Sequence, residues 1–352
     1  MATNSQQSRE VEQFKYQKAE SKVIRLPQGE VIKEIHIMAK GKFAHTYASG
    51  SPTLKKHGVL DALCRGIRCV EDGNKIVKSY KGVKVLRNLS EWIQGSGLAS
   101  YFKKNSSTLG AFSSVTKGFP DIGSTTEETS FLDTVIIPFD GKLSTEYART
   151  RWNLRDKTDA YIQIDFNELA DLLEIGSDAA TVSADIDFYV SIVTSPALSD
   201  VAFAKWKQTF KEEELSGPAV EKRIDLISGG LQQGFWLSLE KGSTREPLTL
   251  EECLETKVKV ILDQAGQGQS ILKSTNLLEL MAINENKTMI EDFIPSAAYV
   301  NFLDNKTFGT ALNTGVGSGV QKLDLVLTTP AGISYSPNPL IVRVEHDTIE
   351  AQ

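Results

Sequence analysis

The sequence predicts an all-β protein built from two tandem β-sandwich domains. Apolar and polar residues alternate over short segments, which is the period of a half-buried strand. In residues 184–193, Ile186 and Phe188 fall on one face of such a strand, and Asp185 and Asp187 fall on the other. The 26 glycines and 11 prolines interrupt these segments at short intervals. The sequence lacks the sustained alternation of strands and helices that would indicate a parallel α/β sheet.

Short strands account for most of the predicted regular structure. The same alternation appears in residues 31–38, 134–139, 161–166, 258–262, 323–327 and 340–344. Because turn residues separate these segments, antiparallel sandwiches or barrels are the expected architecture. A few short helices are predicted near capping residues, at residues 88–95, 167–176 and 277–281.

Residues 200–215 form the longest predicted helix. Phe203, Trp206 and Phe210 recur there at helical spacing, which indicates an apolar stripe that packs against a domain. We therefore expect this helix to join the two domains. The predicted organisation is a flexible polar N-terminal arm at residues 1–22, a first domain at 23–197, a linker with this helix at 198–222 and a second domain at 223–352.

An internal repeat indicates two copies of one β-domain. Residues 76–86 (IVKSYKGVKVL) and 271–281 (ILKSTNLLELM) align without gaps and share an isoleucine, a lysine and a serine. Further segments correspond in the same order along the chain. They pair residues 29–37 with 234–239, 135–141 with 298–305, 161–166 with 322–327 and 186–193 with 340–348.

Composition excludes several classes of protein. Among 352 residues, 39 Lys and Arg stand against 45 Asp and Glu, and this net charge of −6 does not favour a protein that wraps nucleic acid. No run approaches the roughly 18 apolar residues of a membrane span, and the polar start lacks the apolar core of a secretory signal. Three cysteines are too few for a disulfide framework. We expect a soluble protein that is made in the cytoplasm.

Motifs that carry chemistry are weak. Residues 315–320 (GVGSGV) resemble a phosphate-binding loop, but such a loop opens a helix and this one leads into a predicted strand. Cys64 and Cys69 lack the second close pair of a zinc site, and Cys253 is remote. The sequence does not exclude a catalytic cysteine–histidine pair, but no local sequence signature supports one. The four histidines show no metal-ligand spacing: His36, His45, His57 and His346.

The charged clusters of the sequence are interpreted as solvent-exposed surface. Asp185 and Asp187 could offer oxygens to calcium from one face of a strand, but solvent-facing aspartates are the commoner case. The basic runs at residues 55–57 and 103–104 are too short for a nucleic-acid site. We therefore predict no catalytic, cofactor-binding or metal-ligating residues, and no cofactor.

The repeat and three local phrases resemble the double jelly-roll major capsid protein of tailless, membrane-containing icosahedral bacteriophages of the tectivirus and corticovirus type. The phrases are a strand–turn–strand at residues 67–82 (IRCVEDGNKIVKSYKG), an opening strand at 23–41 (VIRLPQGEVIKEIHIMAKG) and its repeat at 230–242 (GLQQGFWLSLEKG). The resemblance covers roughly residues 23–350. It implies two tandem eight-stranded jelly-roll barrels, with residues 105–130 as a long loop at one end of the first.

The resemblance also implies a structural role without catalysis. Such chains form pseudo-hexagonal homotrimers that tile an icosahedral shell over an internal membrane. The implied partners are copies of this chain, neighbouring trimers, and penton and minor capsid proteins, with no specific nucleic acid. The N-terminal arm would contact the membrane. The implied location is the virion capsid, after synthesis in the host cytoplasm.

Two other functions fit an all-β chain. A tandem β-sandwich carbohydrate- or ligand-binding protein is the main alternative, although a cupin-like barrel would need clustered His and Glu ligands that the sparse histidines do not supply. A β-rich hydrolase is the third, and the sequence contains no nucleophile–base arrangement for it. A trimer in solution would favour the capsid, whereas a monomer with sugar affinity would favour the binding protein.

Overall fold

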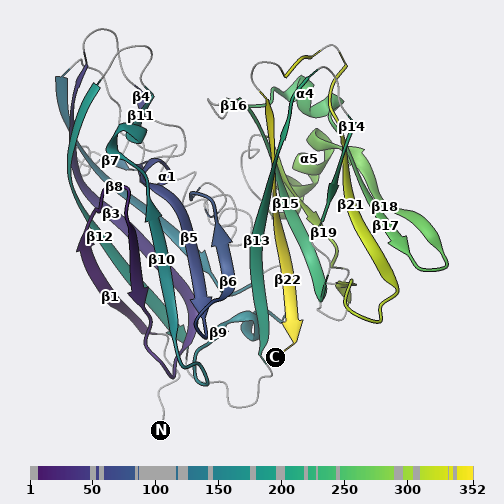
Figure 1. Cartoon of the computed structure of the whole chain (residues 1–352), viewed down its shortest axis with the longest axis horizontal. Helices are drawn as coiled ribbons and strands as arrows, with labels where there is room; N and C mark the ends of the chain where they lie inside the picture. The colour runs from purple at the N-terminus through teal and green to yellow at the C-terminus, as the bar shows by residue number, and fades with distance from the viewer. Residues whose placement is uncertain are drawn as a thin grey trace. The chain divides into compact units, whose positions relative to one another are not determined.

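The structure is a computed structural model and confirms the all-β architecture, since strands dominate and the helices are few and short (Figure 1). It describes residues 7–47, 53–54, 59–83, 86, 116–117, 126–141, 146–174, 180–195, 203–217, 221–226, 229–242, 246–288, 296–303, 310–331, 333–335 and 339–351. Within these ranges, no helix has the length and apolar character that a bilayer crossing needs. The chain divides into two compact units, residues 1–141 with 148–203 and residues 142–147 with 204–352.

The first unit is built from two sets of antiparallel strands. One set pairs in the order β1-β12-β3-β8, and the other in the order β2-β10-β5-β6. The strands of the first set are β1 (Gln7–Lys15), β12 (Ala180–Ser195), β3 (Val31–Tyr47) and β8 (Thr126–Pro138). Those of the second set are β2 (Ser21–Arg25), β10 (Ala160–Phe166), β5 (Cys64–Glu71) and β6 (Lys75–Tyr80).

Shorter elements complete the first unit. They are β4 (Thr53–Leu54), α1 (Val59–Leu63), β7 (Thr116–Lys117), η2 (Tyr147–Thr150), β9 (Trp152–Asn153), η3 (Leu169–Leu172) and β11 (Leu173–Glu174). Aromatic residues join the two sheets of this unit. Phe188 of β12 stacks on Phe14 of β1 with ring centroids 5.4 Å apart, and it meets Phe166 of β10 edge-on at 5.0 Å. These contacts place the core between the sheets, as sandwich packing requires.

The second unit repeats this plan. Its first set pairs in the order β13-β22-β15-β19 and its second in the order β14-β21-β17-β18. The first set consists of β13 (Ala204–Leu215), β22 (Leu340–Ala351), β15 (Leu231–Lys241) and β19 (Ala297–Asn301). The second consists of β14 (Glu221–Asp225), β21 (Val320–Thr328), β17 (Lys257–Gln264) and β18 (Gly268–Asn276). Its remaining elements are β16 (Glu246–Pro247), α4 (Leu250–Glu255), α5 (Leu277–Thr288) and β20 (Leu312–Asn313).

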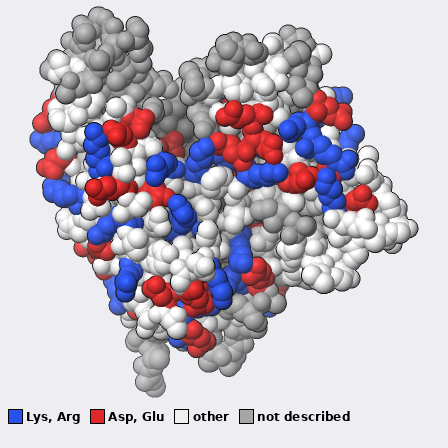
Figure 2. Space-filling model, in the orientation of Figure 1, with Lys and Arg blue, Asp and Glu red and all other residues white. Residues whose placement is uncertain are grey.

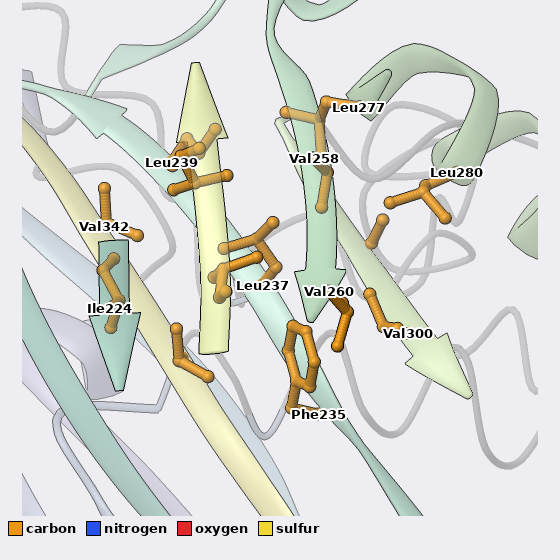
Figure 3. Close-up of a cluster of buried hydrophobic side chains, with 14 of the residues drawn as sticks. Ile224, Phe235, Leu237, Leu239, Val258, Val260, Leu277, Leu280, Val300 and Val342 are labelled. Carbon is orange, nitrogen blue, oxygen red and sulfur yellow. The ribbon is translucent and has the colours of Figure 1, made fainter. Parts of the chain in front are cut away.

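The core of the second unit lies between its two sheets and is closed by helices (Figure 3). Leu237 of β15 and Val342 of β22 come from one sheet, and Val260 of β17 comes from the other. Leu277 and Leu280 of α5 cover the same cluster. Because alternate residues of a strand point to one face, the period-two pattern seen in the sequence delivers these side chains inward.

Strand order confirms the internal repeat. Each of the eight strands in the two sets of the first unit has a counterpart at the same place in the second, in sheet order and in chain order. The segments paired by sequence fall on equivalent strands: β3 with β15, β6 with β18, β8 with β19, β10 with β21, and β12 with β22. This eight-strand plan of two four-stranded sheets is the jelly roll, so the chain contains two of them.

The predicted helix at residues 200–215 is wrong. Residues from Ala204 to Leu215 form strand β13, which pairs with β22 along its whole length. Trp206 and Phe210 are four residues apart, and that spacing fits one helical turn as well as two periods of a strand. Lys207 and Gln208 between them, and the Lys and Glu residues that follow Phe210, raise the helix propensity, but tertiary pairing decides. Trp206 is buried, as expected, although on a strand.

The predicted flexible arm at residues 1–22 is wrong for the part that is described. Residues Gln7–Lys15 form β1, which pairs with β12 from Gln7↔Thr194 to Lys15↔Asp187. The opening strands of the two units are therefore β1 and β13, and not the segments at residues 23–41 and 230–242. An edge strand needs few apolar residues because only one face meets the core, and Phe14 is the one buried residue of β1.

The other predicted helices have mixed outcomes. Residues 277–281 begin α5, as predicted. The predicted helix at residues 167–176 is wrong for its described part, which ends at residue 174: it forms the 3₁₀ turn η3, followed directly by the short strand β11. The helix predicted at residues 88–95 and most of the loop predicted at 105–130 lie outside the described residues, except for β7 and the start of β8.

Candidate functional site

The glycine-rich segment at residues 315–320 is a turn, as predicted. It lies between β20 and β21, where the Ser318 amide donates to the Gly315 carbonyl oxygen over 3.1 Å. Gly317 and Gly319 have φ values of 86° and 77°, which favour glycine. The segment continues into strand β21, so no helix N-terminus is present here to bind a phosphate.

The three cysteines are buried and unlinked, in β5 and α4. Burial raises the pKa of the Cys69 thiol to about 12, against the opposing charge of Lys78. Burial also raises the pKa of Cys253, whose sulfur lies 3.9 Å from the Ser296 hydroxyl. Since the thiolate is the nucleophile and the metal ligand, these two groups are unsuited to either role.

The histidines do not come together as a ligand set. His36 lies on β3 beside Glu34, with 3.3 Å between imidazole Nε2 and Oε1, and His45 is buried further along that strand. His346 lies on β22 in the other unit, where burial lowers its pKa to about 4. His57 is outside the described residues. No group of three His, Cys, Asp or Glu in the described ranges could hold a metal ion.

Asp185 and Asp187 share a face of β12, as predicted, but their partner is an ammonium group. Lys15 of β1 lies 2.5 Å from Asp185 and 3.4 Å from Asp187. All three side chains are at least partly exposed, so this contact adds little to stability. The contact joins two strands that are already paired through their backbones.

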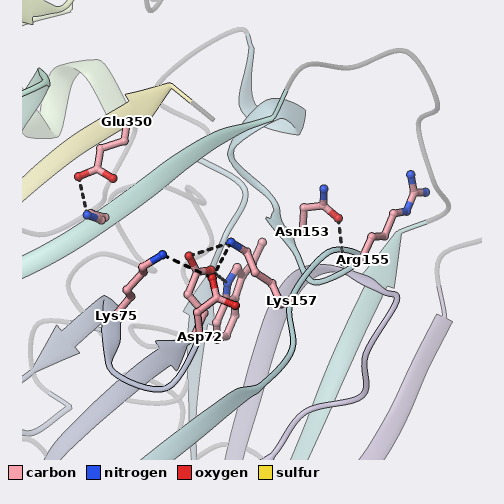
Figure 4. Close-up of polar contacts among 9 residues, drawn as sticks. Asp72, Lys75, Asn153, Arg155, Lys157 and Glu350 are labelled. Carbon is pink, nitrogen blue, oxygen red and sulfur yellow. Dashed lines mark hydrogen bonds and ion pairs between the residues drawn. The ribbon is translucent and has the colours of Figure 1, made fainter.

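A charged cluster that sequence reasoning missed closes one end of the first unit. Lys157, which precedes β10, lies 3.2 Å from both Glu71 and Asp72 at the end of β5 (Figure 4). The Trp152 indole donates to Glu71 over 2.9 Å. Burial lowers the pKa of Lys157, but the hydrogen bonds that its ammonium donates to Asp72 and Glu71 outweigh this effect, and the net direction of the pKa shift is upward. The Asp72–Gly73 turn is visible in the sequence, whereas its partner Lys157 is too distant in the chain to be found.

Strand β22 carries a second polar cluster, which was also missed. Val342 and Val344 face the core, while Arg343, Glu345 and Asp347 occupy alternate positions and are buried as well. Asp347 accepts hydrogen bonds from the Trp206 indole and, over 2.8 Å, from the Tyr299 hydroxyl. The Arg343 guanidinium donates to Glu212 over 2.8 Å.

Glu345 is the unsatisfied member of this cluster. Neither of its carboxylate oxygens has a hydrogen-bond partner among the described residues, and the side chain is buried. Burial raises its pKa to about 8, although nearby Arg343 opposes the shift. Glu345 is therefore neutral at pH 7, and so is the adjacent His346. This arrangement belongs to the interior of the protein and not to an open catalytic cleft.

Surface charge and exposed apolar residues are the remaining candidates. On the face drawn in Figure 2, basic and acidic residues are interspersed, which does not suit a nucleic-acid surface. Large apolar side chains are exposed on β18 and α4 and in the turn before β21: Ile271, Leu272, Leu250, Leu254 and Val316. For a protein without a chemical site among the described residues, such surfaces are where partners would bind.

Comparison with known proteins identifies the fold. No protein-family model and no curated protein matches the chain by sequence. The chain is similar to the crystal structure of the STIV MCP, with a TM-score of 0.66, 10% identity and coverage of 99% of this chain and 97% of that one. It is also similar to the major capsid protein of bacteriophage PM2, with a TM-score of 0.53, 11% identity and 99% coverage of both chains.

A further similar structure is the PBCV-1 virus capsid, with a TM-score of 0.58, 8% identity and coverage of 99% of this chain and 94% of that one. At sequence identities of 8–11%, the similarity establishes a shared fold across nearly the whole chain and does not identify functional residues. The predicted double jelly-roll fold is thereby confirmed.

Proposed function

We propose that this chain is the major capsid protein of an icosahedral virus. The observation that carries the proposal is the presence of two complete jelly rolls with one strand order in a single chain. Proteins whose structures share this fold over nearly the whole chain are named as major capsid proteins. The role is structural, and we propose no catalysis.

The physical logic of two barrels per chain suits a shell. Three chains would give six similar barrels, and such a trimer has a pseudo-hexagonal outline that can tile a facet. Closed symmetry lets large lateral surfaces be buried without growth into fibres. The partners we propose are copies of this chain, then neighbouring trimers, with penton and minor capsid proteins at other positions of the shell.

The finer parts of the proposal concern the virus. We propose a tailless bacteriophage of the tectivirus or corticovirus type, with an internal membrane under the shell, and synthesis of the chain in the host cytoplasm. Contact with that membrane is not assigned to residues Gln7–Lys15, because they form strand β1 within the first unit.

The mass of the protein in solution tests the proposal. Light scattering across a dilution series should give about 116 kDa, three times the chain mass of 38.7 kDa, down to nanomolar concentration. An obligate interface of roughly 2,000–5,000 Å² would hold a trimer together at that dilution. Negative-stain images should show hexagonal particles. A well-folded monomer at every concentration would overturn the proposal, and affinity of that monomer for sugars would favour a tandem carbohydrate-binding protein.

A further inference from the structure

The hairpin turn between β5 and β6 contains the sequence Asp72–Gly73. In an Asp–Gly sequence, the backbone nitrogen of the glycine can attack the side-chain carboxyl of the aspartate, because glycine has no Cβ to hinder the approach. Gly73 is exposed, and a Cβ added there would meet no atom within 4 Å. The turn therefore leaves room for this reaction around the amide.

The backbone of this turn is strained at the aspartate. Asp72 has a φ of 48° and Gly73 has a φ of 85°. This left-handed region is free for glycine but unfavourable for a residue that carries a Cβ, even for aspartate, which tolerates it better than most. A rearrangement that routes the main chain through the side-chain methylene of Asp72 would relieve this strain.

The carboxylate of Asp72 is held by cations from both sides of the turn. Lys157 Nζ lies 3.2 Å from Oδ2, and Lys75 Nζ lies 3.7 Å from the same oxygen (Figure 4). The Thr158 backbone amide also donates to this carboxylate. Burial raises the pKa of Asp72, but the hydrogen bond from Lys157 and its charge outweigh burial, and the net direction is downward. Asp72 is therefore ionised at neutral pH, and an ionised carboxylate resists attack by an amide.

A second Asp–Gly sequence in the same unit is blocked. Asp140 is buried, and its carboxylate lies 2.7 Å from the Arg151 guanidinium. The Gly141 amide donates to the Thr150 hydroxyl over 2.8 Å, and that hydroxyl donates to the Phe139 carbonyl oxygen over 2.6 Å. The nitrogen that would attack is thus already engaged. The chain therefore carries the same dipeptide once in an open turn and once in a buried contact.

We infer that Asp72 is a site of spontaneous isomerisation to isoaspartate and that Lys157 slows this reaction. The Gly73 nitrogen forms a bond to Cγ of the protonated Asp72 carboxyl, the Cγ–OH bond breaks, and the hydroxyl leaves as water with the amide proton. Water then opens the resulting five-membered succinimide. Opening at the side-chain carbonyl restores aspartate, whereas opening at the main-chain carbonyl gives isoaspartate. One water is released and one is consumed, so the product is an isomer of the parent.

Isomerisation would alter the contacts of this hairpin. Isoaspartate adds one methylene to the main chain between β5 and β6 and carries the former main-chain carboxyl as its side group. The Tyr161 hydroxyl donates to the Gly73 carbonyl oxygen over 3.3 Å, and the Asp72 amide donates to the Asp159 carbonyl oxygen over 2.9 Å. The longer main chain would displace these contacts with β10 and the residues before it.

Incubation of the full chain in ¹⁸O-labelled water tests the inference. Every passage through the succinimide leaves one ¹⁸O in the residue, whichever way the ring opens. Trypsin, used afterwards in ordinary water, releases Asp72 in the peptide 69–75 and Asp140 in the peptide 118–142. After several weeks at pH 6 and 37 °C, the peptide 69–75 should carry the label and give a second chromatographic peak of equal composition. The peptide 118–142 should carry little label, and an unincubated sample should carry none.

Three variants assign the reaction to its residues. K157Q removes the ammonium, so the peptide 69–75 should take up label roughly fivefold faster, which corresponds to about 1 kcal/mol of ion pairing. K157R keeps a cation at this position and should take up label at the rate of the parent. D72E should lose the label from this peptide, because glutamate would have to close a six-membered ring, which forms far more slowly.

Each result decides one part of the inference. Label in the peptide 69–75 that does not exceed the label in 118–142, in the parent and in K157Q, would overturn Asp72 as the site. Equal rates in K157Q and the parent would overturn the role of Lys157. Equal acceleration of both peptides in K157Q would also overturn that role, because Lys157 contacts Glu71 as well and its loss would then have loosened the whole unit. Since the label does not depend on assembly, none of these results bears on the capsid role.

Discussion

Replacing Glu345 by glutamine should stabilise the folded protein at neutral pH. The carboxyl is buried and has no hydrogen-bond partner in the part of the chain that the structure describes, and burial raises its pKa from 4.5 to about 8. The folded chain therefore holds this proton between pH 4.5 and 8, while the unfolded chain releases it. A raised pKa gives stability that is fully present below the unfolded value and is lost as pH rises toward the folded value.

The magnitude follows from the size of the shift. Each pH unit between the two pKa values costs about 1.4 kcal/mol of unfolding free energy. At pH 7, the parent should thus have lost about 3 kcal/mol relative to pH 4.5 through this one group. Glutamine keeps the shape of the neutral acid and cannot ionise, so E345Q should not show this loss.

The assay is urea denaturation of E345Q and the parent at pH 5, 7 and 8, followed by tryptophan fluorescence. The difference between the two proteins should grow with pH in favour of E345Q, by about 2–3 kcal/mol from pH 5 to pH 7. His346 titrates in both proteins and cancels in this difference. E128Q is the control, because Glu128 pairs with Lys42 on the surface and should change stability by less than about 1 kcal/mol. A difference that does not change with pH would refute a neutral, buried Glu345.

Three further outcomes are expected. Burial lowers the pKa of His346 to about 4, so the stability that depends on its neutral form is present above pH 6.5 and is lost as pH falls toward 4. Between pH 7.5 and pH 4.5, the unfolding free energy of H346Q should therefore fall by about 2–3 kcal/mol less than that of the parent in the same assay. Parallel curves of unfolding free energy against pH would contradict this. Ellman's reagent should titrate no thiol in the native protein and three after denaturation, and rapid reaction of a native cysteine would show that it is accessible. A chain that starts at Ser21 lacks Phe14, whose ring stacks on Phe188, so its unfolding free energy should fall by about 3 kcal/mol or more; unchanged stability would mean that β1 contributes nothing to the core.

The strands that could be predicted from the sequence are those with one buried face. In β12, alternate residues such as Ile186 and Phe188 reach the core, and the period of two is plain. Strands β1 and β13 escaped prediction for different reasons. Strand β1 is an edge strand in which Phe14 alone is buried, and the spacing of Trp206 and Phe210 in β13 also fits a helix.

The polar clusters could not have been predicted from local sequence. Lys157 meets Glu71 only because β10 pairs with β5, so the contact joins residues that are far apart along the chain. The Trp206–Asp347 hydrogen bond likewise depends on the pairing of β13 with β22. In both cases, charge and hydrogen-bonding capacity are visible in the sequence, but their partners are set by the sheet.

The two units also show why similar sequence does not give similar surroundings. Lys78 and Lys273 occupy the same place in the repeat, but Lys78 is fully buried with its ammonium 4.9 Å from the Phe139 ring centroid, and Lys273 is partly exposed. Cores tolerate many apolar substitutions when pattern and volume are kept, so strand order survives while identities drift. What a strand meets on its outer side is free to differ between repeats.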